Sequence, residues 1–224
     1  MFNSDSMKEA VACLDELDVI QDAIASRVIL EDSVEEVTSI AAVGHAFIRD
    51  MALSHVVAVD TDMQLLEEAT VIERMEIPYV PGLLFCREGR AVLKAMRALR
   101  HKCDVLLVDA CGINHFRFAG LASHIGVILD MPTVGVSRRT LCGEYATPRT
   151  PGSYCRLQFC NRTVGFVLQT KQGTRPIFIS PGHRVSLQGS LEIASASLRD
   201  HKMPEPLHIA RVKAQALKRA IWQS

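Results

Sequence analysis

The 224 residues, of which 48% are hydrophobic and 22% charged, suit one globular domain and exclude an intrinsically disordered chain. Lysine plus arginine and aspartate plus glutamate each number 25, so the formal net charge is zero. A nucleic-acid partner would therefore have to be held by local basic patches. No apolar run reaches the roughly 18 residues of a membrane span, so no membrane partner is expected.

The seven cysteines are scattered and form no Cys-x-x-Cys pair, which argues against a structural zinc site and a secreted disulfide framework. The first residues are mixed and acidic, without the basic and then apolar segments of a signal peptide. We therefore expect a reducing compartment, the cytoplasm.

The first third of the chain predicts a helix followed by an antiparallel meander. Apolar residues recur at helical spacing over residues 6–29, and Ser6 stands three residues before Glu9, as in a capping box. The short connections between the next three apolar segments favour antiparallel pairing. These predicted strands are Val37–Phe47, Val56–Val59 and Glu67–Ile77.

Strands and helices then alternate. The predicted strands are Asp104–Asp109, Pro132–Val136, Val164–Leu168 and Pro176–Ser180. The predicted helices are Gly89–Arg100, Phe118–Leu129, Ser190–Leu198 and Pro204–Trp222, and Leu141–Pro151 is predicted to be a loop. This order predicts one α/β domain over residues 1–224, with a mixed sheet of three antiparallel strands followed by parallel strands, and helices on both faces.

Two carboxylates stand at the ends of apolar segments that should be buried. Asp109 closes the run Val105–Val108, so it should emerge at the carboxyl edge of a central strand, where ligands gather in open α/β sheets. Glu88 follows a Pro-Gly turn. Buried charges need partners, often a metal ion. The alternatives are that Asp109 caps the next turn and that Glu88 starts a helix.

Three histidines could join these carboxylates. His183 follows a strand in Ser180-Pro181-Gly182-His183-Arg184, where it could act as a general base or metal ligand, or simply make the hydrogen bonds of a loop histidine. His115 and His124 carry the same alternatives, and His124 could be satisfied within the core. Glu88, Asp109 and a histidine would form an oxygen-rich site of the kind that Mg²⁺ prefers.

Tyr79 lies between two prolines and a glycine, and such a rigid aromatic tip could enter a base stack. The alternative is a packed tyrosine in a Pro-rich turn. Arg138 and Arg139 follow a buried strand at the expected edge of the site, where they could contact phosphate.

Taken together, the chain resembles the endonuclease V family over residues 14–217. The residues that carry the resemblance include Pro78-Tyr79-Val80-Pro81-Gly82, Phe85-Cys86-Arg87-Glu88, Val108-Asp109, Gly112-Ile113, His115, Gly120–Gly126, Pro132–Val136, Ser180–Arg184 and Pro204-Glu205-Pro206. The resemblance implies a ribonuclease H-like fold and Mg²⁺-assisted cleavage, with Mn²⁺ as a possible substitute, of a phosphodiester 3′ to inosine in DNA or RNA.

The resemblance also implies roles for individual residues. Tyr79, Pro81 and Gly82 fall on the wedge and the pocket for the flipped base. Glu88 and Asp109 fall on the metal-binding carboxylates. His183 falls on the catalytic histidine. His115, Arg138 and Arg139 join the set expected to contact nucleic acid, which could be inosine-containing or otherwise single-stranded.

The sequence departs from the family on its first strand. Aligned with the family pattern Ala-Gly-Val-Asp-Val, Gly44 replaces the first metal-binding aspartate, and strand alternation would turn His45 to the opposite face. The family's Asp-Gly-His-Gly has become 109–112, Asp-Ala-Cys-Gly. We therefore expect cleavage to be strongly weakened or lost. The alternative is a non-catalytic nucleic-acid-binding or scaffold protein on the same fold.

Overall fold

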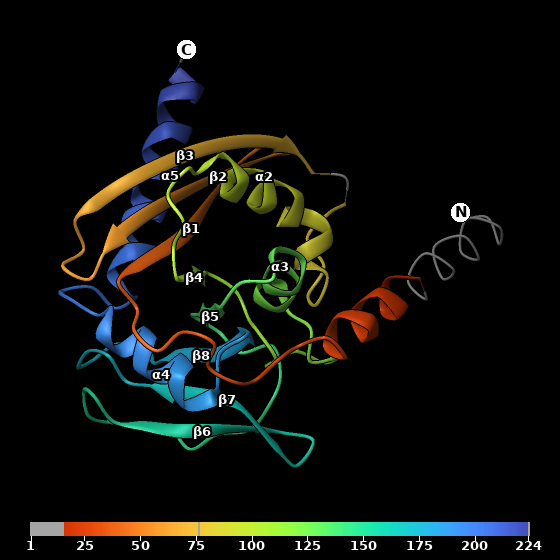
Figure 1. Cartoon of the computed structure of the whole chain (residues 1–224), viewed down its shortest axis with the longest axis vertical. Coiled ribbons are helices and arrows are strands. Elements are labelled where there is room, and N and C mark those ends of the chain that lie inside the picture. The colour runs from red at the N-terminus through yellow and green to blue at the C-terminus, as the bar shows by residue number, and fades with distance from the viewer. Residues whose placement is uncertain (1–15, 76, 224) are drawn as a thin grey trace.

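The computed structural model describes residues 16–75 and 77–223. One eight-stranded sheet in the order β3-β2-β1-β4-β5-β8-β7-β6 runs through it (Figure 1). β1 (Ser39–Ile48), β2 (Met51–Asp60) and β3 (Leu65–Arg74) form the predicted antiparallel meander, with the edge strand β3 alternating between exposed and half-buried residues. β2 is longer than the predicted strand Val56–Val59. The prediction was too short because polar Ser54 and His55 interrupt the apolar pattern, although both side chains are buried.

The centre of the sheet is parallel, as predicted. β4 (Val105–Val108) pairs with β1 on one side and with β5 (Thr133–Ser137) on the other, both in parallel register. All four residues of β4 are buried, since helices cover both faces of the sheet here.

The last three strands correct the prediction. β8 (Ile177–His183) is antiparallel to β5, and β7 (Arg162–Leu168) and β6 (Tyr154–Phe159) continue antiparallel, so the later strands are not parallel. β6 was not predicted at all. In the turn of its hairpin, φ is positive at Cys160 (48°) and at Asn161 (59°). Turns of this kind usually have the sequence Asn-Gly, and Cys-Asn is not a recognisable turn signal.

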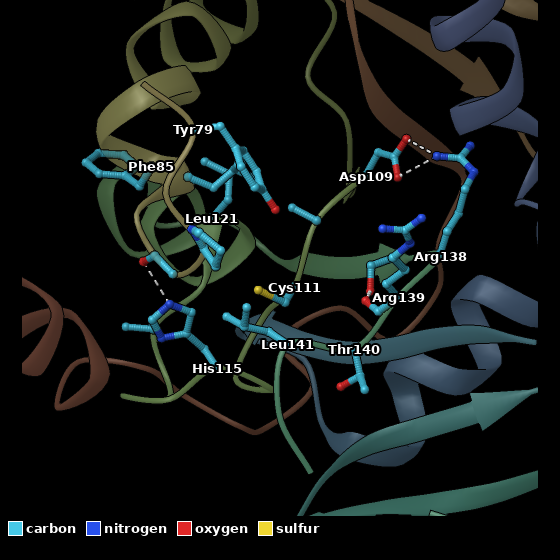
Figure 2. Close-up of a pocket in the computed structure, with 16 residues that line it drawn as sticks. Tyr79, Phe85, Asp109, Cys111, His115, Leu121, Arg138, Arg139, Thr140 and Leu141 are labelled. Carbon is cyan, nitrogen blue, oxygen red and sulfur yellow. Dashed lines mark hydrogen bonds and ion pairs between the residues drawn. The ribbon is translucent and has the colours of Figure 1, made fainter. Parts of the chain in front are cut away.

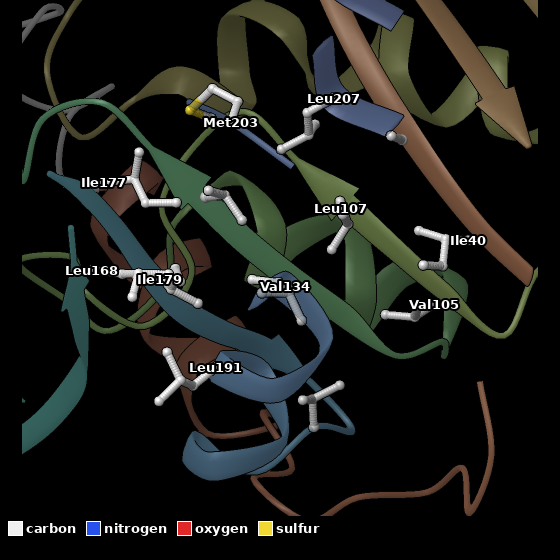
Figure 3. Packing of buried hydrophobic residues seen from close by; sticks show 14 of the residues in the cluster. Ile40, Val105, Leu107, Val134, Leu168, Ile177, Ile179, Leu191, Met203 and Leu207 are labelled. Carbon is white, nitrogen blue, oxygen red and sulfur yellow. The ribbon is translucent and has the colours of Figure 1, made fainter. Parts of the chain in front are cut away.

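Helices pack on both faces, as predicted (Figure 1). α2 (Arg90–Ala98) and α3 (Leu121–Leu129) bury apolar residues against one face, in a core that includes Val92, Leu121 and Ile125. α4 (Leu187–Ala196) and α5 (Glu205–Gln223) cover the other face. Figure 3 shows this second core, where Leu191 and Leu207 of the helices meet Ile40, Leu107 and Val134 of the sheet.

Residues 16–25 are helical, and Ile24 packs against Ala119 and Val127. The capping box predicted at Ser6 and Glu9 lies outside the described residues. Among the residues that the structure describes, no helix is long and apolar enough to cross a membrane.

Candidate functional site

The site lies at the edge where the parallel strands β4 and β5 both end. Asp109 follows β4 and Arg138 follows β5, so parallel register brings the two side chains together. Nη1 of Arg138 donates to both carboxylate oxygens of Asp109, at 2.7 and 3.1 Å (Figure 2). The predicted edge position of Asp109 is therefore observed, but its oxygens face a guanidinium.

Glu88 approaches the same edge from a π-helical segment, η1 (Phe85–Gly89), that runs into α2. Such segments often occur at functional sites. The carboxylate is buried, with 4% exposure, and Nη1 of Arg87 donates to its Oε1 at 3.1 Å. Burial raises the pKa of Glu88 to about 7; the charge of Arg87 opposes this rise and that of Asp109 adds to it.

His45 on β1 lies beside these carboxylates. Its Nε2 is 4.0 Å from Oε2 of Glu88, and its Nδ1 is 3.0 Å from the hydroxyl of Ser54 on β2. The Nε2 atom is buried without a hydrogen-bond partner among the described residues. Burial lowers the pKa of His45 to about 4, with the charge of Asp109 acting in the opposite direction, so the ring is neutral near pH 7.

This geometry corrects the expectation for the first strand. Gly44, and not His45, points away from the carboxylates: a Cβ on Gly44 would lie 2.5 Å from backbone atoms of Ala210 and Arg211 in α5. The absence of a side chain at Gly44 thus lets α5 pack directly on β1. A carboxylate at position 44 would face α5 instead of Glu88.

A cavity of about 380 Å³ opens beside the carboxylates, under the turn that carries Tyr79. Tyr79 is 62% exposed. Figure 2 shows the side chains around this cavity, which include Tyr79, Phe85, Cys111, His115, Leu121 and Arg138. An apolar hollow with a few polar groups at its rim is the usual form of a small-ligand site.

The turn over the cavity is held by neutral hydrogen bonds to one carbonyl. The oxygen of Gly82 accepts from Nε2 of Gln21 at 2.7 Å and lies 2.9 Å from Nε2 of His115. Gly82 itself has φ of 87°, which favours glycine. Nδ1 of His115 accepts from the backbone N–H of Arg117 at 3.1 Å, so Nε2 carries the ring proton. His115 is buried, holds the turn and lines the cavity, and its predicted contact with nucleic acid stays a prediction.

The strand end behind Asp109 is fixed by a buried network. The backbone N–H of Gly112 donates to the hydroxyl of Ser180 at 2.8 Å, and this hydroxyl donates to Oδ1 of Asn114 at 2.5 Å. His124 does not share in it: its ring stacks on Phe85 at 4.2 Å, and neither ring nitrogen has a partner among the described residues. The expectation that His124 is satisfied in the core is wrong.

His183 is not brought to this edge. It pairs with Thr133 at the start of β5, whereas Arg138 follows the end of that strand. Steps of about 3.3 Å per residue place these two ends roughly 13 Å apart along the sheet. Nδ1 of His183 accepts from the backbone N–H of Ile29 at 3.2 Å, and Nε2 is 3.4 Å from Asp130. His183 thus lies at the edge opposite the remaining site residues, and its catalytic role stays a prediction that this placement does not support.

Three residues of the site were missed from the sequence. Arg87 lies over the rings of Phe47 and Tyr79, at 4.4 and 5.7 Å from its guanidinium carbon, and so connects the exposed tip with Glu88. Its position next to Glu88 was the available signal. Nothing in the sequence indicated the contact of Gln21 with Gly82, and His45 was expected on the opposite face of the strand.

Comparisons with known proteins match nearly the whole chain. The family model described as Endonuclease V matches residues 22–212. The Endonuclease V of Thermus thermophilus is 40% identical over 206 residues, covering 89% of this chain and 91% of that protein. The chain belongs to the Endonuclease V family. That of Thermosipho melanesiensis is 34% identical over 201 residues, covering 89% of each.

Solved Endonuclease V structures share the fold. The Bacillus subtilis protein has a TM-score of 0.87 at 25% identity, and that from Streptomyces avermitilis 0.82 at 32% identity, each covering 93% of both chains. The Ciona intestinalis Endonuclease V, solved with a 24mer DNA containing an inosine, is similar in fold, with a TM-score of 0.82 at 20% identity over 94% of this chain and 99% of that one. The mixed sheet is therefore ribonuclease H-like, as the resemblance implied.

Endonuclease V enzymes generally depend on a divalent metal ion, and the residues of this chain do not fit one as they lie. Within residues 16–75 and 77–223, no group of three His, Cys, Asp or Glu side chains could hold a metal ion. Asp109 and Glu88 each already pair with an arginine. His45 offers a nitrogen where a hard cation such as Mg²⁺ prefers oxygen.

Proposed function

We propose that this protein recognises inosine in DNA or RNA, and that metal-dependent cleavage 3′ to the inosine is strongly weakened or lost. One observation supports both parts of the proposal. At one edge of the sheet, an open cavity lies beside two carboxylates that are already paired with arginines. The cytoplasm is the proposed compartment, on the scattered cysteines of the sequence.

The cavity and its rim support recognition of a base. Exposed Tyr79 can separate stacked bases, and the hollow below it can receive a base removed from the stack. Arg138 and Arg139 line the same cavity and can contact the adjoining phosphate. The Ciona intestinalis relative was solved with inosine-containing DNA, which agrees with this assignment.

The carboxylates support the loss of cleavage. Glu88 and Asp109 are the residues that the family resemblance assigns to Mg²⁺ or Mn²⁺, and their pairing with Arg87 and Arg138 opposes binding of a cation. Loss of catalytic groups commonly costs several powers of ten in rate, and each tenfold is about 1.4 kcal/mol of barrier. A non-catalytic binding or scaffold protein on the same fold is the alternative.

One assay tests both parts of the proposal. A labelled single-stranded oligonucleotide with one inosine, and a matched one with adenosine, are incubated with the protein in Mg²⁺, Mn²⁺ or EDTA, and binding and cleavage are measured. We expect tighter binding of the inosine oligonucleotide and no turnover comparable to an active Endonuclease V.

Fast cleavage that is abolished in Asp109→Ala would contradict the loss of catalysis. Equal binding of the inosine and adenosine oligonucleotides would contradict the recognition of inosine and favour the scaffold alternative.

A further inference from the structure

A second cavity, of about 370 Å³, adjoins the first along the arginines at the sheet edge. Arg138, Arg139 and Thr140 line both cavities. Beyond these shared residues, the second cavity is lined by Tyr145, Thr147, Arg175, Pro176 and Phe178. The two hollows are thus neighbours, and cationic side chains stand between them.

The lining of the second cavity has the chemistry of a nucleotide site. Tyr145 is 40% exposed, and its ring packs edge-on against buried Phe178, with centroids 5.2 Å apart and planes at 78°. Three arginines and no carboxylate line the cavity. An accessible aromatic ring beside arginines is how proteins hold single-stranded nucleic acid, through base stacking and phosphate contact.

The ring of Tyr145 is held in place from both sides of its loop. The backbone of Glu144 makes two hydrogen bonds with Gln158 on β6, of 2.8 and 2.9 Å. The carbonyl of Ala146 accepts from the thiol of Cys155 on the same strand. A preorganised ring loses little conformational freedom when a base stacks on it.

Positive charge extends around this cavity. The pKa of Lys202 is lowered, first by burial and then by the nearby charges of Arg138 and Arg175. Lys202 therefore lies close enough to both arginines to be affected by their charges. Such a local field can hold phosphates although the whole chain has no net charge.

We propose that the second cavity binds the nucleotide next to the inosine, with its base against Tyr145, the linking phosphate at Arg138 and Arg139, and the nucleotide's other phosphate at Arg175. This inference rests on the proposed function, because the first cavity must hold the inosine. The two cavities would then take two consecutive nucleotides across the shared arginines. The neighbouring nucleotide contributes affinity through stacking, without selection for its base.

The test compares Tyr145→Ala with a matched control, Tyr154→Ala. Tyr154 is 53% exposed and also packs edge-on against a phenylalanine, Phe166, at 5.6 Å and 90°, but it does not line this cavity. Binding is measured by fluorescence anisotropy in EDTA with three oligonucleotides. One has inosine between normal neighbours, one is abasic 3′ to the inosine, and one is abasic 5′ to it.

We expect Tyr145→Ala to weaken binding of the first oligonucleotide about tenfold. The effect should vanish on one of the two abasic oligonucleotides, which identifies the side that the cavity reads. Tyr154→Ala should leave all three affinities unchanged. The inference is overturned if Tyr145→Ala matches Tyr154→Ala on the first oligonucleotide, or if its loss persists on both abasic oligonucleotides.

Arg175→Gln adds an electrostatic readout. Removing one phosphate contact should reduce the slope of log affinity against log salt by about 0.7 for a single strand. Arg156→Gln, an exposed arginine on β6, serves as the control and should not change the slope. An unchanged slope in Arg175→Gln contradicts the phosphate contact.

The two proposals fail in different ways. If the native chain prefers inosine over adenosine while the Tyr145 and Arg175 variants bind normally, the second cavity is wrong and the proposed function stands. If Tyr145→Ala couples to a neighbouring base but inosine is not preferred over adenosine, the proposed function fails.

Discussion

The two halves of the site are built from different interactions. The cavity half is held by neutral hydrogen bonds with their partners in place, as between Gln21, His115 and the carbonyl of Gly82. The carboxylate half is held by charges. Glu88 and Asp109 are paired with arginines, and the buried Nε2 of His45 has no partner among the described residues.

This difference is the basis of our proposal that recognition outlasts cleavage on this scaffold. Holding a base needs a hollow, an aromatic tip and local positive charge, and a few compatible side chains supply these. Holding a divalent cation needs several oxygen ligands at once, with nothing else neutralising them. Arginines beside the carboxylates oppose the second requirement while serving the first.

The largest effect is expected where β1 meets α5. Gly44→Asp would force a Cβ to within 2.5 Å of the backbone of α5, so either the helix or the strand must move. We expect a loss of at least about 3 kcal/mol in the free energy of unfolding, measured by urea denaturation. It should not restore cleavage, although the sequence alignment suggests that it would.

His45→Asp is the matched partner of that substitution, because its side chain faces Glu88. This variant should gain stabilisation by Mn²⁺, of about 2.7 kcal/mol at one hundred times the dissociation constant, which the native chain should lack. The assignment of position 44 to the α5 face and of position 45 to the Glu88 face would be wrong under one outcome. In that outcome, Gly44→Asp folds with native stability and cleaves in Mn²⁺, while Mn²⁺ does not stabilise His45→Asp.

Much of the fold was predictable because its elements obey strong local patterns. The uninterrupted apolar run Val105–Val108 marked a central strand, and its following residue, Asp109, was correctly expected at the carboxyl edge. The periodic apolar residues of α2 and α5 marked helices. The hairpin at Cys160 and Asn161 was missed because its turn lacks the usual residues and β6 is mostly exposed or half-buried.

The site was harder to predict because it depends on which face each residue takes. The strand register decides that His45 and not Gly44 faces Glu88. The close packing of α5 on β1 is a tertiary contact that local sequence does not indicate. The carbonyl that joins Gln21 to His115 is likewise a contact between residues distant in sequence. Only the family resemblance placed His183 beside Asp109. In the structure, β8 pairs antiparallel with β5, and this puts His183 at the edge of the sheet opposite Asp109.

A smaller effect should appear in the pH dependence of stability. The pKa of Glu88 rises from its ordinary 4.5 to about 7 in the fold, so the folded chain holds this proton more tightly than the unfolded chain. Its stabilising contribution is complete below pH 4.5 and is lost as pH rises through 7. Glu88→Gln cannot titrate, so it should exceed the native chain in stability by about 3 kcal/mol at pH 8 and nearly match it at pH 4.5.

Urea denaturation in EDTA at the two pH values measures this difference. Burial lowers the pKa of His45 to about 4, so its contribution to the stability of the fold decreases as pH falls below 6.5. Because His45 is present in both proteins, this contribution cancels in the comparison. Glu192→Gln, at an exposed position on α4, is the control. A Glu88→Gln protein with the same pH profile as the native chain would mean that Glu88 is not desolvated.

The cavity half should respond to loss of a single donor. Gln21→Glu keeps the shape of the side chain but sets a carboxylate oxygen against the carbonyl of Gly82, where an amide now donates at 2.7 Å. We expect a loss of about 1 kcal/mol in unfolding free energy and a weaker preference for inosine. Gln21→Met, which removes the donor without adding charge, should cost less. An unchanged preference for inosine in both variants would mean that the hydrogen bond from Gln21 to the turn at Gly82 does not contribute to recognition of the base.

The smallest expected effect bears most directly on the contrast between the two halves. Asp109→Asn removes a carboxylate charge that competes with phosphate for the guanidinium of Arg138. Both side chains are partly exposed, 21% for Asp109 and 35% for Arg138, so the pair is worth less than about 1 kcal/mol. Affinity for the inosine oligonucleotide should therefore rise about threefold, and by the same factor in Mg²⁺ and in EDTA.

A double-mutant cycle with Arg138→Gln assigns the cause. If Asp109 acts by occupying Arg138, then Asp109→Asn should have little effect once Arg138 is replaced. A general loss of negative charge would instead raise affinity equally in both backgrounds. A protein that uses Asp109 to hold a metal ion would behave in the opposite way, because Asp109→Asn would weaken binding in Mg²⁺ and leave it unchanged in EDTA. The sign of this small change thus decides whether arginine or metal neutralises the sheet edge.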